Sequence, residues 1–412
     1  MNKYSRLLRS FLPGLFLVSY NVGIGSVTMM SKSGALYGCS LLWIVLLSSV
    51  IYYYLVSVFS KYTMVTRETF LYAVKKHISR KVSLFIIGAI CLIIFPALMG
   101  LMGIMCDVLS EWSVSWGTGK ISSSVWGFVL ASLVAIFFLL GTTEKIKSIL
   151  SGIVVIIFFA FVANLFYAFP PASTFFKGLI PTIPEDIAGS DNGTFLIMAG
   201  MVGTTVSSIA FIIRSSLVKE ANWDFSYYRQ QKKDALLSAI GVFLISAAIL
   251  VSATATLYVN DLTVNSAVDL ILLLKPIVGE ASIVFMSIGI LAAGITSHIP
   301  NIMVIPWVVS DYKSVIFDMK NTKNRCLLIF LTFIGVLTPV FHWKPVFIML
   351  LSQGLLAVLL PLTVGCIYYL MNNKIMKDDR NNLKDNILLG IVFLFTLFIG
   401  GLGLVGLIKD IV

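Results

Sequence analysis

The chain has 412 residues, of which 58% are hydrophobic and 12% charged, and its formal net charge is +11. Soluble domains carry roughly 45–50% apolar and about 25% charged residues, so this composition excludes a soluble enzyme. The apolar residues lie in repeated runs of about 20, the length that crosses a hydrocarbon core roughly 30 Å thick. The sequence therefore predicts an all-α polytopic membrane protein, because a helix satisfies its own backbone groups in lipid.

Eleven runs are long and apolar enough to be transmembrane helices, and the segments between them are too short for a soluble domain. The first run follows a basic N-terminus as in a signal peptide, but no small-residue cleavage site is evident, so we expect a retained helix. Residues 1–412 are thus predicted to form a single transmembrane domain. The predicted spans are 11–34, 38–60, 82–108, 124–141, 147–169, 194–217, 235–258, 281–308, 325–341, 345–371 and 386–408.

The basic residues are divided unequally between the two sides of the predicted membrane domain. If successive spans alternate in direction, 24 of the 30 Lys and Arg residues lie on the side of the N-terminus. Cytoplasmic loops are enriched in Lys and Arg. We therefore predict a multi-pass protein of the cell's inner (plasma) membrane, with a cytoplasmic N-terminus and a C-terminus on the outer side. Topology explains the net charge, and no nucleic-acid partner is expected. The six basic residues on the outer side are Lys32, Lys120, Lys177, Lys275, Lys344 and Lys409.

The first and sixth spans each contain a run of small and polar residues. One is NVGIGS (residues 21–26) and the other is GMVGTTVSS (residues 200–208). They occupy the first spans of two successive five-span blocks, and such matched interruptions point to a midplane binding site in inverted-repeat transporters. A broken helix frees N–H and C=O groups, and a bound ion can be their partner. The alternative is that both runs are packing faces for neighbouring helices.

Segments spread along nearly the whole chain resemble the Nramp family of divalent-metal transporters. They are ALYGCSLLWIVLLSS at residues 35–49, VGTTV and SSLV in the sixth span, LLKPIVGEA and GILAAGITS near the eighth, and LLSQGLLAVLLPL with NNKIM at the tenth. The resemblance implies a LeuT-like fold of two inverted five-helix repeats, about 11–169 and 194–371, with broken helices 1 and 6. An extra C-terminal helix at about 386–408 would follow.

The metal-binding motifs of that family are absent. Its helix 1 carries Asp-Pro-Gly-Asn where this chain has Gly23-Ile24-Gly25-Ser26, and its helix 6 carries Met-Pro-His-Asn where this chain has Ser207-Ser208-Ile209-Ala210. The run FPALMGLMG (residues 95–103) has no carboxylate at the position of the family's helix 3 acids. Divalent cations prefer charged oxygen donors or softer ligands, so we predict no metal-ligating residue, no carboxylate proton relay and no cofactor.

The residues at the two breaks favour a small inorganic anion as the transported ion. Half-helix N-termini present unpaired N–H groups and partial positive charge, and hydroxyl groups donate further hydrogen bonds. We predict a secondary transporter that moves such an anion, bicarbonate first, by alternating access, with Na⁺ as a candidate coupling ion. Asn21 and Arg214 are assigned to the pathway; the alternative for Arg214 is snorkelling to the interface. The predicted substrate-binding residues are Gly23, Gly25, Ser26, Thr204, Thr205, Ser207, Ser208 and Gln353.

Two other functions stay open at this point. A divalent-cation transporter of the Nramp type, for Mg²⁺ or Mn²⁺, would use backbone carbonyls at the breaks, although a divalent charge without an anionic partner is costly in a membrane. The second open function is that of a non-transporting membrane sensor or a subunit of a larger complex. An enzyme is not expected, because His77, His298 and His342 lie far apart and no nucleophile and base are suitably spaced. We expect a monomer whose partners are the inorganic ion and the bilayer.

Overall fold

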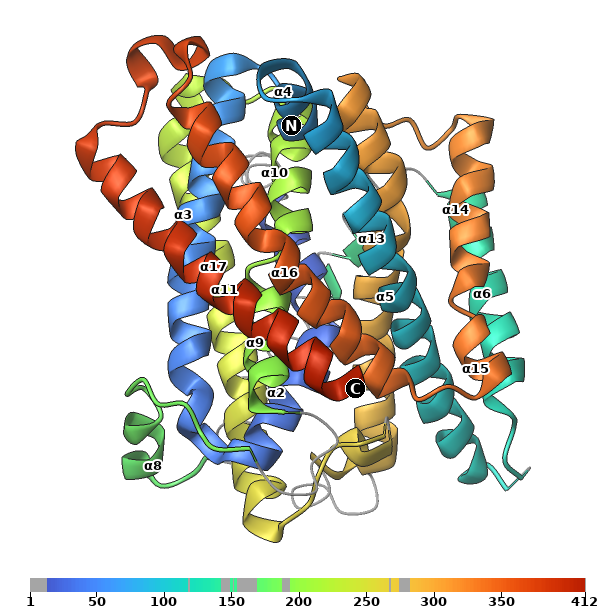
Figure 1. The fold of residues 1–412 in the computed structure, drawn as a ribbon. Coiled ribbons are helices and arrows are strands. Elements are labelled where there is room, and N and C mark those ends of the chain that lie inside the picture. The colour runs from blue at the N-terminus through green and yellow to red at the C-terminus, as the bar shows by residue number, and fades with distance from the viewer. Residues whose placement is uncertain are drawn as a thin grey trace, which may run out of the picture.

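The computed structural model describes residues 13–117, 119–141, 149–150, 152–153, 169–186, 193–266, 268–273 and 282–411. These residues form helices and connecting turns, with no β-strand among them. The long helices lie side by side in one bundle, with the short helices α4 and α8 at its opposite ends (Figure 1). We call these the α4 end and the α8 end. The predicted all-α class is confirmed.

The first predicted span is broken into two half-helices. Residues 13–21 are helical, residues 22 and 23 are not, and α2 (Ile24–Tyr37) follows. The short 3-10 helix η1 (Gly38–Leu41) leads into α3 (Leu42–Thr66). Gly38 has a φ of +56°, which glycine adopts readily because it has no Cβ. The chain thus turns sharply enough for α3 to run back along the bundle.

The rest of the first half includes two long helices, α5 (Arg80–Val114) and α6 (Ser123–Leu140), and the two short helices α4 (Phe70–His77) and α8 (Ala172–Lys177). Most of the predicted fifth span, 147–169, lies outside the described residues. The number of eleven spans and the extent of the first repeat therefore stay predictions.

The second half begins with the other broken helix. Its two parts are α9 (Thr194–Thr205) and α10 (Ser208–Glu220), separated by Val206 and Ser207. Both breaks predicted from the sequence are confirmed. The remaining elements are η2 (Phe225–Tyr227), α11 (Tyr228–Thr256), η3 (Tyr258–Asn260), η4 (Val268–Leu273), α13 (Ser282–Lys313), α14 (Thr322–Ile334), α15 (Leu337–Phe341), α16 (Pro345–Met371), η6 (Lys374–Asp379) and α17 (Leu383–Ile411).

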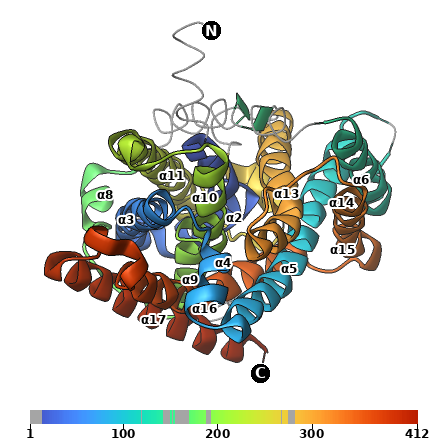
Figure 2. The same ribbon diagram turned by 90° about the horizontal axis from the view of Figure 1, so that it is seen from above.

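Nine helical segments of the described chain are long and apolar enough to cross a membrane. Their burial sorts them into a centre and a periphery. The most apolar window of Thr194–Glu220 is wholly buried inside the protein, whereas only 28% of the window in α6 is buried. Viewed from the α4 end, α9, α10 and α2 lie in the middle, and α6, α14 and α17 lie at the rim (Figure 2). The two broken helices therefore form the core, where lipid does not reach their interrupted backbone.

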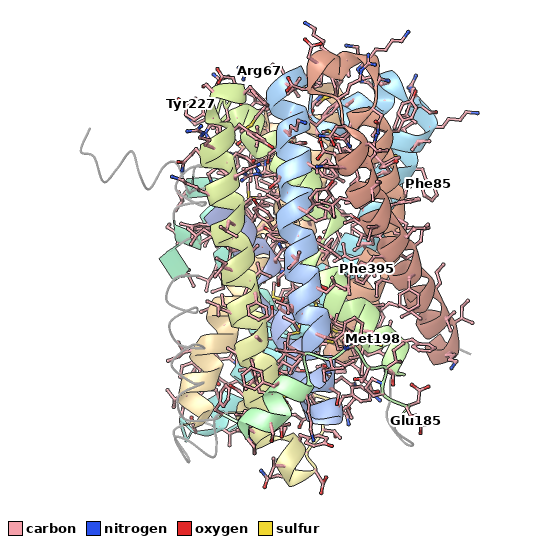
Figure 3. All side chains as sticks on the ribbon, turned by 90° about the vertical axis from the view of Figure 1, so that its left-hand side faces the viewer. Arg67, Phe85, Glu185, Met198, Tyr227 and Phe395 are labelled. Atoms are coloured by element: carbon pink, nitrogen blue, oxygen red, sulfur yellow. The ribbon has the colours of Figure 1, made fainter. Side chains whose placement is uncertain are left out.

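Side chains follow the same division. Phe85 on α5 is 66% exposed and points outward, as expected of a lipid-facing residue (Figure 3). Arg67 and Tyr227 lie at the α4 end, and Glu185 lies at the α8 end (Figure 3). Polar side chains thus gather at both ends, on either side of an apolar band.

Candidate functional site

The break in the first span places two opposite helix ends beside one another. The half-helix 13–21 ends at Asn21, where its last carbonyls have no later helical N–H to accept from, and α2 begins at Ile24 with Gly23 as its N-cap. Gly23 is needed for packing, since a Cβ there would lie 1.3 Å from the Ser297 hydroxyl oxygen. The break therefore sits directly against α13.

The break in the sixth span repeats this arrangement. Thr205 is the last residue of α9, and Ser207 is the N-cap of α10 with extended backbone angles. Gly203 packs against α16, because a Cβ on it would lie 2.2 Å from the backbone oxygen of Gln353. Carbonyl ends and N–H ends of four half-helices thus converge at the centre of the bundle.

The two breaks are joined by a hydrogen bond between hydroxyl groups. The Ser26 hydroxyl donates to the Asn21 backbone oxygen at 2.5 Å and lies 2.9 Å from the Thr204 hydroxyl. A serine hydroxyl has one proton, so the Thr204 hydroxyl must be the donor in the second contact. The oxygen of Thr204 consequently keeps its lone pairs for another partner.

A small cavity of about 30 Å³ lies between the breaks. A water molecule needs about 10–15 Å³ on this measure, so the cavity admits roughly two particles of that size. Helices α5, α13 and α16 complete its wall. Its polar lining residues are Tyr20, Asn21, Ser26, Thr204, Ser207, Ser297, Asn301, Ser352 and Gln353, with the Met349 thioether beside them.

Most of the hydroxyl protons around the cavity are directed away from it. The Ser297 hydroxyl donates to the Ala293 oxygen at 2.9 Å, and the Ser352 hydroxyl donates to the Ile93 oxygen at 3.1 Å. With Ser26 and Thr204, four of the five serine and threonine residues in the lining have committed protons. These four hydroxyl groups thus offer oxygen lone pairs to the cavity, which attract a cation and repel an anion.

The remaining polar groups include two that are open to a ligand. The Asn21 carboxamide and the Ser207 hydroxyl make no hydrogen bond of standard geometry with a described residue, although the Tyr52 hydroxyl lies near the first and the Tyr20 hydroxyl near the second. Buried polar groups are rarely left without a partner, because this costs about 1–3 kcal/mol each. None of the lining residues is Asp, Glu, Lys, Arg or His, and the described chain holds no cluster of three or more His, Cys, Asp or Glu side chains. The site is therefore polar and formally neutral.

The predicted binding residues separate into two groups. Gly23, Gly25, Ser26, Thr204, Ser207 and Gln353 line the cavity together with the predicted pathway residue Asn21. Thr205 and Ser208 do not line it. The Thr205 hydroxyl donates to the Met201 oxygen within α9, and the Ser208 hydroxyl contacts the Thr363 hydroxyl at 3.0 Å.

Arg214 lies apart from the cavity. Its side chain is fully buried, so it does not snorkel to an interface, and its Nη1 lies 2.6 Å from Asp234 Oδ2. An arginine paired in this way has no charge left over for an anion. Asp234 itself was not among the predicted residues.

Five further lining residues were not among the predicted ones. Tyr20 and Asn301 lie near the first break and in span 8, and Ser297, Met349 and Ser352 were not singled out at all. Met349 lies four residues before Gln353, so the two side chains share one face of α16. Ser352 is the direct neighbour of Gln353, and sequence spacing does not predict that it lies on that face. That i, i+4 relation to Gln353 was the available signal.

Two broken helices that face one buried polar cavity at the centre of an all-helical membrane protein define a carrier of the inverted-repeat class. Residues 14–406 match the family described as natural resistance-associated macrophage protein-like. The chain belongs to this family, Nramp, as its sequence resemblance implied. Since the members of this family are membrane transporters, the expectation that the chain is not an enzyme is confirmed.

Individual relatives agree with this assignment. The chain is 25% identical over 267 residues to a divalent metal cation transporter MntH of Caldanaerobacter subterraneus, covering 63% of this chain and 61% of the relative. It is 24% identical over 428 residues to the natural resistance-associated macrophage protein 2 homolog of Dictyostelium discoideum, covering 99% of this chain and 65% of the relative. The chain thus spans less than two thirds of the length of both.

The fold is shared with a solved structure. A manganese transporter of Eremococcus coleocola, in complex with an aromatic bis-isothiourea substituted compound, superposes with a TM-score of 0.78. The superposition covers 100% of this chain and 88% of that one, at 17% sequence identity. The predicted LeuT-like architecture with broken helices 1 and 6 is confirmed.

The prediction of a small inorganic anion as cargo, with bicarbonate first, is wrong. The matching relatives are named for divalent metal cations. The physical reason lies in the direction of the hydroxyl protons, which serine and threonine letters do not reveal. Na⁺ was a candidate coupling ion because it would attract a bound anion. Without an anionic cargo, this reason for expecting Na⁺ no longer applies. The predicted anion partner is wrong for the same reason, because the relatives are named for metal cations, while the monomeric state stays a prediction.

Proposed function

We propose that the protein is a secondary transporter of divalent metal cations that works by alternating access. The observation that carries the proposal is the lining of the cavity, where four of five serine and threonine hydroxyls turn their protons away. Family membership over residues 14–406 and relatives named for divalent metal cations support it.

The lining favours hard cations of the Mg²⁺ and Mn²⁺ class. Its donors are hydroxyl oxygens and the amide oxygens of Asn21, Asn301 and Gln353, and such oxygen ligands suit Mg²⁺, Ca²⁺ and Mn²⁺. No carboxylate neutralises the ion, so the carbonyl ends of the half-helix 13–21 and α9 must supply the negative potential. With about 30 Å³ available, the bound ion keeps about one water.

Charge distribution supports a cytoplasmic α4 end. Arg67 follows α3, Lys75 and Lys76 lie in the last turn of α4, and Lys219 and Lys232 lie at the end of α10 and the start of α11. Because Lys and Arg are enriched on the cytoplasmic side, we place the N-terminus inside and the C-terminus outside a plasma membrane.

Flux measurements in proteoliposomes test the proposal. Vesicles containing the protein and a Mg²⁺- or Mn²⁺-sensitive dye are compared with protein-free vesicles, and labelled bicarbonate uptake is followed in parallel. We expect saturable uptake of at least one of the two cations and no bicarbonate uptake above the protein-free level. Absence of uptake of both cations by folded protein contradicts the proposal and favours a non-transporting sensor or subunit.

A further inference from the structure

A second buried polar cluster lies between the cavity and the α4 end. Arg214 on α10 and Asp234 on α11 are 0% and 1% exposed and form an ion pair of 2.6 Å. The Arg214 Nε donates to the Ser60 hydroxyl of α3 at 2.8 Å. A buried charge that loses its partner is strongly destabilising, so the two residues fix α3, α10 and α11 relative to one another.

The same carboxylate also holds the first half-helix. Asp234 Oδ1 accepts the backbone N–H of Gly14 at 3.0 Å. Gly14 lies near the start of the described part of the half-helix 13–21, and its backbone N–H is donated to a charged acceptor. A Cβ on Gly14 would lie 2.3 Å from Asp234 Oδ1 and 2.4 Å from the Ser238 hydroxyl oxygen. Only glycine lets the backbone approach the carboxylate this closely.

The half-helix 13–21 links this cluster to the cavity. Its far end carries Tyr20 and Asn21, which line the cavity, and seven residues of helix separate Asn21 from Gly14, or about 10 Å. The fully buried Tyr52 of α3 lies beside Asn21 and beside the Arg214–Asp234 pair. Movement at Gly14 therefore reaches the binding cavity through one rigid element.

The half-helix also fills the space between α11 and α13. Phe16 is fully buried and meets Trp307 of α13 edge-on, with ring centroids 5.5 Å apart. Val18 lies on the opposite side, where a Cβ on Gly241 of α11 would be 3.7 Å from it. Held at Gly14 by Asp234, this segment runs from the Arg214–Asp234 pair to the cavity wall formed by Tyr20 and Asn21.

We propose that Arg214 and Asp234 are positioning residues that hold the half-helix 13–21 closed over the cavity by way of the Gly14 N–H. Release of this bond opens a route from the α4 end to the transported ion. The inference goes beyond the proposed function and does not depend on which ion is carried, because closure is a property of the protein alone.

Labelling of a cysteine in the cavity tests the proposal without any cargo. Ser207→Cys places a thiol in the lining, and its rate of reaction with a membrane-impermeant maleimide is measured in vesicles of both orientations, with Cys326→Ser removing the exposed native thiol. Gly14→Ala keeps both charged residues but forces the half-helix and the Asp234 carboxylate apart, whereas Asp234→Asn removes the charge that holds the half-helix. Gly241→Ala is the matched control, since its Cβ makes only ordinary contacts with Val18.

We expect Gly14→Ala and Asp234→Asn to accelerate labelling from the α4 end about tenfold, as for loss of a charge-assisted hydrogen bond, and Gly241→Ala to leave it unchanged. Equal rates in folded Gly14→Ala and parent proteins overturn the proposal. Hydrogen exchange of the wild-type chain provides a second measurement that requires no substitution. We expect amides of residues 15–21 to exchange faster than those of α2 by local opening, and equal protection also overturns the proposal.

Discussion

Single hydroxyl groups decide the chemistry of this site, and two neighbouring threonines show how. Thr204 presents its oxygen to the cavity, whereas the Thr205 hydroxyl donates to the Met201 oxygen 2.9 Å away in its own helix. The two residues have the same type and the same helix, but only one can contact an ion. Their different roles follow from the 100° rotation between successive helical residues.

Replacement of these threonines by the isosteric valine distinguishes the two roles. Thr204→Val removes one cation ligand, so we expect the KM for Mn²⁺ or Mg²⁺ uptake to rise roughly tenfold, as for a contact of about 1.4 kcal/mol. Thr205→Val is the matched control and should change KM by less than a factor of about two. Dye-based uptake in proteoliposomes measures both variants. A KM equally affected in both would mean that the cavity is not the cation site.

Met349 carries the only sulfur atom in the lining of the cavity. Its terminal methyl lies 2.6 Å from the position that a Cβ on Gly25 would take, so the side chain extends from α16 to the first break. Thioether ligands favour softer metals over Mg²⁺. Met349→Leu conserves volume, and we expect a several-fold loss of Mn²⁺ and Cd²⁺ uptake relative to Mg²⁺ uptake.

Met29→Leu is the control for this substitution. Met29 is fully buried against Gly200 of α9 and does not line the cavity. Competition between Cd²⁺ and Mg²⁺ in the uptake assay gives the selectivity directly. If Met349→Leu and Met29→Leu change selectivity alike, the thioether of Met349 acts in packing and not as a ligand.

At the level of helices, close contact between α9 and α16 holds the second break in place. Gly203 lies so near the backbone oxygen of Gln353 that a Cβ there would be 2.2 Å from it. We expect Gly203→Ala to lower the free energy of unfolding by about 1–3 kcal/mol, as overpacking does. It should also reduce uptake, since the displaced Gln353 lines the cavity. Thermal unfolding followed by size-exclusion chromatography measures the first effect.

Gly401→Ala on α17 provides the comparison, because nothing lies within 4 Å of the added Cβ. Helical propensity favours alanine over glycine by about 1 kcal/mol, so this variant should be as stable as the parent or more so. Equal destabilisation of the two variants would show that the α9–α16 contact is looser than its geometry indicates.

The broken helices could be predicted from the sequence, but their exact positions could not. Clusters of glycine and serine at matched positions in spans 1 and 6 indicated interruptions, because glycine lowers helix propensity and hydroxyl groups can bond to freed backbone groups. The second break nevertheless falls at Val206 and Ser207, beyond Gly200 and Gly203. Those glycines stay helical because their role is contact with Met29 and Gln353, which only the three-dimensional arrangement reveals.

The prediction of the transported ion's class was wrong for a related reason. The sequence gives the hydroxyl groups of Ser26 and Thr204, but the direction of their protons depends on a carbonyl and a second helix. Arg214 was assigned to the pathway, but it is buried in an ion pair away from the cavity. Its partner Asp234 lies 20 residues away in α11, and a local pattern cannot show that the two side chains meet.

At the level of the whole molecule, the position of the basic residues predicts which end faces the cytoplasm. A native thiol tests this without redesign of the chain. Cys326 is the one cysteine classed as exposed among the described residues, and it lies in the first turns of α14, which follows α13 at the α4 end. Cys39, Cys106 and Cys366 are buried, and Cys91 lies within the apolar helix α5. An impermeant reagent should therefore report on Cys326 alone.

We expect a membrane-impermeant maleimide to leave the wild-type protein unlabelled in intact cells and to label it after permeabilisation. Cys326→Ser should abolish the signal in permeabilised cells, which establishes the origin of the label. If wild-type protein is labelled in intact cells and Cys326→Ser abolishes that labelling, the α4 end lies outside. The half-helix 13–21 would then close the outer route to the cavity, and the charge distribution of the loops would no longer account for the topology.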